Sequence, residues 1–275
     1  MNHRVLIDFG SHSIKVYQYL SEAETLELVD TLTWRSLESF NSWELIHDFL
    51  SKVADLFPKS FYKIEAVGTA AVRRCEKMAQ DVQRACSRYG IHFEVISQEK
   101  EAALIRSAFE GYSVKNIVNV GGGSIQIVNT HQSTPLLYSF GISDLVRQFK
   151  LDAENPLERQ RGECIDFLTN KILKMDGSFV YSGGEYSYLA RCGVVLDDKK
   201  CWTEEFQKLV DRFDKMRMSE IVQLSPYDPQ WMLGSIASNS IVEVLLEKSK
   251  QEYFYASDLN IAHGLCKSYL VGGRK

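Results

Sequence analysis

The spacing of apolar residues divides the chain into alternating strands and helices. Apolar runs and alternations predict strands at 4–8, 13–20 and 25–33, and a helical period of apolar residues follows at 42–57. The rest of the first half continues the alternation, with elements expected at 63–70 (strand), 76–89 (helix) and 92–96 (strand) and a helix that begins at Ser97, whose side chain suits an N-cap. This order is typical of an α/β domain.

The pattern starts again near residue 115. A strand is expected at 115–120, followed by a glycine turn, a second strand (SIQIVN) and a third near 134–140. The remainder is mostly helical, with helices expected at 143–150, 157–174, 203–214 and 229–247, a strand at 178–182, and a last helix capped by Ser257 or Asp258.

The first strand–turn–strand segments of the two halves align without a gap. "LIDFGSHSIKV" aligns with "IVNVGGGSIQI", so that Asp8 falls on Asn119 and Lys15 on Gln126, at an offset of 119 − 8 = 111 residues. A shared strand, turn and strand at this distance indicates a duplication, with two domains built on one plan.

The duplication predicts a domain boundary in the short loops near residues 110–114. We therefore expect domains at 1–112 and 113–275, with their hairpin turns facing across a cleft. The last segment, 258–275, is expected to pack back on the first domain.

Composition excludes several classes of function. The chain has 275 residues, 45% of them hydrophobic, and a net charge of −4, which gives no electrostatic footprint for nucleic acid or an anionic membrane. No apolar run approaches the length of a transmembrane helix, and the N-terminus lacks the apolar region of a signal peptide. The six cysteines include no C-x-x-C pair, which favours reduced thiols in a cytoplasm.

The two glycine turns are candidates for phosphate binding. Glycines let several backbone N–H groups approach a phosphate closely, and the hydroxyls of Ser11, Ser13 and Ser124 would add neutral donors. A lone turn of this kind is more often only a tight hairpin. A pair, one domain apart, favours a clamp on a phosphate chain.

Six fragments then identify a family resemblance. The chain resembles the Ppx/GppA family of exopolyphosphatases and guanosine pentaphosphate phosphohydrolases in the order and spacing of "IDFGSHSIKV", "AVGTAAVRR", "EVISQEKEAALI", "VNVGGGSIQIV", "SFGISDLVRQF" and "VYSGGEYSYLA". The resemblance implies an α/β fold of two duplicated ribonuclease-H-like domains, of the actin-like (ASKHA) superfamily, with an interdomain cleft. It also implies hydrolysis of a terminal phosphoanhydride, usually with Mg²⁺.

The resemblance assigns roles to residues of this chain. Glu101 matches the family's catalytic carboxylate and is the candidate base, while Asp8 matches the aspartate of the first loop and is a catalytic candidate and a weak candidate for a metal ligand. The matching phosphate-binding positions are Gly10, Ser11, His12, Ser13, Arg73, Gly121, Gly122, Gly123 and Ser124.

The chain departs from the family at two carboxylates. The second loop, usually "DxGGGSxE", has Asn119 for the aspartate and Gln126 for the glutamate, and Glu185 stands where the family usually has threonine. An amide carries no charge for Mg²⁺ and is a poor base, and loss of a general base costs a factor of about 10²–10⁴. Glu101 also has a plain structural alternative, because any carboxylate gains from the first turn of a helix.

Two functions follow, with a third less favoured. The first is a family homologue, in effect a pseudoenzyme, that binds polyphosphate or a guanosine tetra- or pentaphosphate with weak or no hydrolysis and weakened use of Mg²⁺. The alternative is an active exopolyphosphatase or pppGpp phosphohydrolase with Glu101 as base, and the third is a small-molecule kinase. A homodimer is a further expectation, with no nucleic acid or membrane partner.

Overall fold

The computed structural model describes residues 3–20, 25–34, 43–154, 158–172 and 175–272. The chain forms two compact units. The first comprises Met1–Ala108, Gly121–Gly123 and Ile261–Lys275, and the second comprises Phe109–Val120 and Ser124–Asn260. The units divide after Ala108, four residues before the boundary expected from the sequence.

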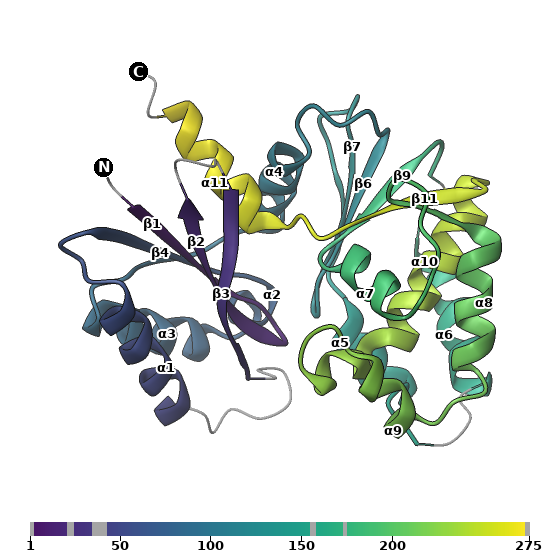
Figure 1. The fold of residues 1–275 in the computed structure, drawn as a ribbon, viewed down its shortest axis with the longest axis horizontal. Coiled ribbons are helices and arrows are strands. Elements are labelled where there is room, and N and C mark those ends of the chain that lie inside the picture. The colour runs from purple at the N-terminus through teal and green to yellow at the C-terminus, as the bar shows by residue number, and fades with distance from the viewer. Residues whose placement is uncertain (1–2, 21–24, 35–42, 155–157, 173–174, 273–275) are drawn as a thin grey trace. The chain divides into compact units, whose positions relative to one another are not determined.

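The first unit contains a five-stranded sheet in the order β3-β2-β1-β4-β5 (Figure 1). The strands β1, β2 and β3 form an antiparallel meander, and β4 and β5 continue the sheet in parallel with β1. The strands are β1 (His3–Phe9), β2 (Ser13–Leu20), β3 (Thr25–Thr33), β4 (Tyr62–Gly68) and β5 (His92–Val95). The helices of this unit are α1 (Trp43–Leu56), α2 (Ala70–Arg74), α3 (Glu76–Arg88), α4 (Gln98–Ala108) and α11 (Ile261–Gly272).

Apolar residues of β1 alternate between two buried faces of the first sheet. Val5 and Ile7 pack with residues of α1 and α3, whereas Leu6 packs with Ala262 and Cys266 of α11. The helix α11 therefore completes a layer of the first unit, although it comes from the other end of the sequence.

The second unit repeats this plan and extends it. Its sheet has the order β10-β11-β9-β6-β7-β8, so β8-β7-β6-β9-β11 reproduces the order and directions of the first sheet, and β10 is an additional antiparallel edge strand. The strands are β6 (Asn116–Val120), β7 (Ile125–Asn129), β8 (Leu136–Tyr138), β9 (Phe179–Ser182), β10 (Lys200–Trp202) and β11 (Tyr253–Ser257). The helices are α5 (Ile142–Phe149), α6 (Glu158–Lys171), α7 (Glu185–Arg191), α8 (Thr203–Phe213), α9 (Met218–Ile221) and α10 (Ser235–Ser249).

The register of the two hairpins confirms the internal repeat. In the first, Asp8 pairs with Lys15 across β1 and β2. In the second, Asn119 pairs with Gln126 across β6 and β7, so both members of the pair are displaced by the same 111 residues. A slip of one residue would have turned every side chain to the other face, so the match extends to which face each residue occupies.

Two expectations for the second half were wrong, and three of its elements were missed. The helix expected at 229–247 begins as a 3₁₀ turn, Pro229–Gly234, before α10. The last helix begins at Ile261 rather than after Ser257 or Asp258, because Ser257 ends β11 and the Asp258 carboxylate accepts hydrogen bonds from Ser187. The strands β10 and β11 and the helix α7 were not anticipated, and parts of the helix expected at 157–174 lie outside the described residues.

None of the helices within the described ranges is long and apolar enough to cross a membrane.

Candidate functional site

The first glycine loop joins β1 to β2 and is held by its own backbone and by one tryptophan. The Gly10 N–H donates to the Ser13 carbonyl at 3.1 Å. Trp34, directly after β3, donates its backbone N–H to the His12 carbonyl at 3.1 Å and its indole Nε1–H to the Gly10 carbonyl at 2.7 Å. Sequence reasoning missed Trp34, whose only signal was its place at the end of the third strand of the meander.

Asp8 lies on β1 beside this loop and is half-buried. Its Oδ1 atom is buried and has no hydrogen-bond partner. Burial raises the pKa of this carboxyl to about 6, while the positive charge of Lys15, its cross-strand neighbour, opposes the shift. Asp8 is therefore a carboxylate with an unsatisfied oxygen and a cation facing it.

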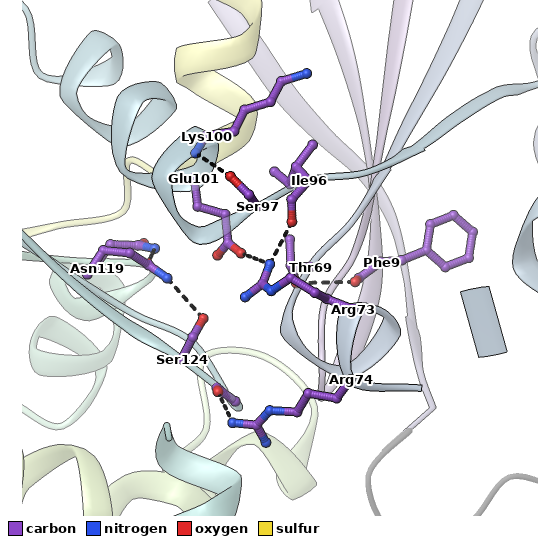
Figure 2. A network of polar contacts seen from close by, with 12 residues as sticks. Phe9, Thr69, Arg73, Arg74, Ile96, Ser97, Lys100, Glu101, Asn119 and Ser124 are labelled. Carbon is purple, nitrogen blue, oxygen red and sulfur yellow. Dashed lines mark hydrogen bonds and ion pairs between the residues drawn. The ribbon is translucent and has the colours of Figure 1, made fainter. Parts of the chain in front are cut away.

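The tip of the second glycine loop, Gly121–Gly123, groups with the first unit. At Gly123 a Cβ would lie 2.9 Å from the Cβ of Ala70 and 3.1 Å from the Ser11 Oγ, which leaves no room for a larger residue. The Arg74 guanidinium donates to the Gly123 carbonyl, as Figure 2 shows. Arg74 was not among the expected site residues, although it follows Arg73 directly.

The two amides of the second hairpin bind each other. The Asn119 Nδ2 donates to the Gln126 Oε1 at 2.6 Å, and the Gln126 Nε2 donates to the Ser124 Oγ at 2.9 Å. The Ser182 hydroxyl donates to the Asn119 Oδ1 at 3.4 Å, since β9 places Ser182 directly beside Asn119. Gln126 is fully buried. Two ionised carboxylates in this contact would repel each other, whereas two amides satisfy each other.

Glu101 is paired with an arginine within the first unit. The Arg73 Nη1 donates to the Glu101 Oε1 at 2.5 Å and to the Ile96 carbonyl at 2.7 Å (Figure 2). Glu101 is only 4% exposed and lies in the first turn of α4. Ser97 caps that helix, because its Oγ accepts from the Lys100 N–H at 3.2 Å, as expected.

The fourth strand of each sheet leads into a helix through a short turn. In the first unit, Thr69 donates its N–H and hydroxyl to the Phe9 carbonyl. In the second unit, Gly184 adopts a φ of 114°, which favours glycine, and Glu185 follows as the first residue of α7.

Glu185 is buried, and its Oε1 has no hydrogen-bond partner. Burial, and to a lesser extent the nearby negative charge of Asp258, raises the pKa of this carboxyl to about 8. Asp258 itself accepts the Ser187 N–H at 3.0 Å and the Ser187 hydroxyl at 2.6 Å. At neutral pH, Glu185 is therefore mainly protonated.

Comparison with known proteins identifies the family. The family model "Ppx/GppA phosphatase family" matches residues 42–270, most of the chain. The chain belongs to the Ppx/GppA phosphatase family. No curated protein matches the sequence significantly.

Solved structures show the same fold. A Ppx/GppA family member from Aquifex aeolicus is 18% identical, with a TM-score of 0.75 over 100% of this chain and 99% of that one. An exopolyphosphatase from Cytophaga hutchinsonii is 15% identical, with a TM-score of 0.82 over 98% of each chain. A second structure of the Aquifex aeolicus enzyme is 20% identical, with a TM-score of 0.69 over 97% of this chain and 99% of that one. The expected fold class, α/β with two duplicated actin-like domains, is confirmed.

The side chains of this Ppx/GppA protein fit a resident Mg²⁺ poorly. Mg²⁺ is held by carboxylate oxygens together with phosphates and water. The second hairpin supplies two neutral amides that are bonded to each other, and the first supplies Asp8 alone, with Lys15 opposite. Within the described part of the chain, no three His, Cys, Asp or Glu side chains form a group that could hold a metal ion.

Proposed function

We propose that this Ppx/GppA protein binds a condensed phosphate and hydrolyses it slowly or not at all. The ligand is polyphosphate or a guanosine tetra- or pentaphosphate. The observation that carries the proposal is the hydrogen bond between Asn119 and Gln126, because it occupies the two positions where the family usually has carboxylates.

Phosphate binding is supported by the chemistry of the glycine loops. A turn without β-carbons lets backbone N–H groups approach an anion, and Gly123 has no space for a side chain. Ser11 and Ser13 of the first loop and Ser124 of the second add hydroxyls, and Arg73 and Arg74 bring positive charge to the same unit as the loop tip. His12 adds an imidazole, for which we propose a contact with the ligand.

Slow hydrolysis follows from what the amides cannot do. Cleavage of a phosphoanhydride needs a base to take a proton from water and charged oxygens to hold Mg²⁺ against the phosphates. Neither Asn119 nor Gln126 can take a proton from water or offer a charged oxygen to Mg²⁺. Where a lost carboxylate is the general base, its loss costs about 10²–10⁴-fold. Any Mg²⁺ that arrived with the ligand would find only Asp8 among the hairpin residues.

An active enzyme with Glu101 as base is the second candidate. It is favoured by one observation, that Glu101 is buried and held in place by Arg73 at 2.5 Å, as a preorganised base would be. However, the same contact occupies one oxygen of the carboxylate. If Glu101 is the base, Glu101→Gln abolishes whatever phosphate release the protein has; unchanged release would eliminate this candidate.

The main experiment measures phosphate release with Mg²⁺ and either polyphosphate or pppGpp. We expect the wild-type protein to release little phosphate and the double variant Asn119→Asp/Gln126→Glu to release at least about 10²-fold more. Turnover by the wild-type protein at rates normal for an enzyme would overturn the proposal.

A matched control lies on the same two strands. Asn129 donates its Nδ2 to the Asn116 Oδ1 at 3.0 Å, and these residues pair across β6 and β7 at the end away from the loop. The variant Asn129→Asp adds a charge to the same hairpin without touching the loop. It should leave phosphate release at the wild-type level.

A further inference from the structure

The hydrogen bonds of the second hairpin run in one direction. Ser182 donates to Asn119, Asn119 donates to Gln126, and Gln126 donates to Ser124. Each amide therefore gives and receives one hydrogen bond within the chain of contacts. Such an arrangement is neutral and polarised toward the loop, because consecutive hydrogen bonds reinforce one another.

The direction sets the role of Ser124. Its Oγ accepts from the Gln126 Nε2, so its own hydrogen points elsewhere and can be donated to another acceptor. A glutamate at position 126 would have no N–H to give, and Ser124 would have to donate to it instead. The glutamine thus turns the hydroxyl of the loop into a donor, which suits an anion.

The first hairpin is also close to neutral. Lys15 lies opposite Asp8 across the two strands, and its positive charge offsets the negative charge of Asp8. Neither hairpin, taken by itself, presents the net negative charge that attracts a divalent cation, whereas each presents N–H or O–H donors at its turn.

We propose that this protein binds its condensed phosphate as a metal-free anion, with Gln126 as the positioning residue that orients Ser124 toward the ligand. The inference rests on the proposed function and adds the chemical form of the ligand. A family member with two carboxylates here would hold the phosphates through Mg²⁺, while this chain uses direct hydrogen bonds.

The test is calorimetric titration with sodium tripolyphosphate, in EDTA and again with excess Mg²⁺. We expect the wild-type affinity in EDTA to equal or exceed that in Mg²⁺, since Mg²⁺ bound to the ligand only screens its charge. Gln126→Glu keeps the size of the side chain and adds a charge. It should weaken binding in EDTA by about tenfold or more, and Mg²⁺ should restore it.

Two further variants separate positioning from folding. Ser124→Ala should weaken binding equally in both buffers, because it removes a donor without adding charge. Asn129→Asp, which adds the same charge at the other end of β7, should bind as the wild-type protein does in both buffers. A purely structural role for Gln126 would lower affinity in both buffers, and Mg²⁺ would restore nothing.

Two results would overturn the inference, and they differ. If the wild-type protein binds tripolyphosphate only with Mg²⁺, the metal-free form is wrong and the proposed function stands. If it binds neither tripolyphosphate nor pppGpp in either buffer, the proposed function itself fails.

Discussion

The two units use one backbone plan but place their carboxyl groups differently. In the first, Asp8 lies on the hairpin strand, and the helix after the fourth strand begins with Ala70. In the second, the hairpin position carries Asn119, and the corresponding helix begins with Glu185. Each unit thus has one poorly solvated carboxyl group. In the first unit it lies on the hairpin strand, and in the second it lies at the start of the helix after the fourth strand.

The difference separates the determinants of fold from those of chemistry. Apolar alternation fixes the register of the hairpin strands, and both sheets share the order of five strands, to which the second adds β10. The polar residues at the strand ends vary without changing that plan. Membership of the family therefore establishes the fold, while activity depends on a few side chains at the turns.

Removing the buried acid of the second unit should give the largest effect. The folded state raises the pKa of Glu185 to about 8, so between about pH 5 and pH 8 the folded protein keeps a proton that the unfolded chain loses. Stability should therefore fall as pH rises through this window, by at most about 5 kcal/mol at about 1.4 kcal/mol per pH unit.

The variant Glu185→Gln should remove that pH dependence and raise stability at about pH 8. Urea unfolding of the wild-type protein and the variant at several pH values measures how the free energy of unfolding changes with pH. Equal slopes for the two proteins would show that Glu185 does not titrate in the folded state as its burial implies.

Removing the carboxyl group of Asp8 in the first unit should change the pH dependence of stability at lower pH. Burial raises the pKa of Asp8 to about 6, so its contribution to stability is full below about pH 4 and is lost as pH rises to about 6. The loss is at most about 3 kcal/mol, which is the shift from 3.8 to about 6 at about 1.4 kcal/mol per pH unit, and it is smaller in practice because solvent reaches the half-buried residue.

Asp8→Asn makes the first hairpin resemble the second. It should flatten the stability profile below about pH 6 and leave the part governed by Glu185 intact. A change of slope confined to the higher window would contradict the assignment of the two groups.

Much of this comparison was predictable from the sequence. The gapless match of "LIDFGSHSIKV" with "IVNVGGGSIQI" predicted the duplication, with Asp8 equivalent to Asn119 and Lys15 to Gln126, and the register of the two hairpins confirmed these equivalences. Apolar alternation is a local signal and survives in a single sequence. The strands β10 and β11 were missed because they are short and lie among helical patterns.

The partners of the candidate residues could not be read from the sequence. Trp34 and Arg74 reach the loops, and Ser182 reaches Asn119 of β6, through contacts between residues distant in the sequence that no local pattern marks. The hydrogen bond between Asn119 and Gln126 depends on the antiparallel register of β6 and β7. The ion pair between Arg73 and Glu101 depends on how α2 is placed relative to α4. The role of each site residue stays a prediction.

The two glycine loops should differ in their tolerance of a methyl group. At Gly123 a Cβ meets three groups, the nearest at 2.9 Å, whereas at Gly10 it meets only the Ser13 carbonyl at 3.1 Å. Gly123→Ala should cost about 1–3 kcal/mol by overpacking, and Gly10→Ala less.

Chemical unfolding measures both costs, and Gly162→Ala in α6 is the control. Nothing lies within 4 Å of a Cβ at Gly162, so alanine should stabilise that helix by about 0.5–1 kcal/mol. Equal costs at Gly123 and Gly10 would mean that the tip of the second loop is not packed as described.

The smallest expected effect concerns β10, the strand that the first sheet lacks. Asp197 and Lys200 exchange two backbone hydrogen bonds around a two-residue turn, in which Asp198 and Lys199 adopt positive φ values of 44° and 66°. Glycine takes this conformation without the steric cost that other residues carry, so Lys199→Gly should raise stability by about 0.5–1 kcal/mol. Lys200→Gly, at the first residue of β10, should have the opposite sign, because glycine weakens a strand. Thermal unfolding of the two variants side by side checks this, and a loss of stability in Lys199→Gly would show that the turn is not strained.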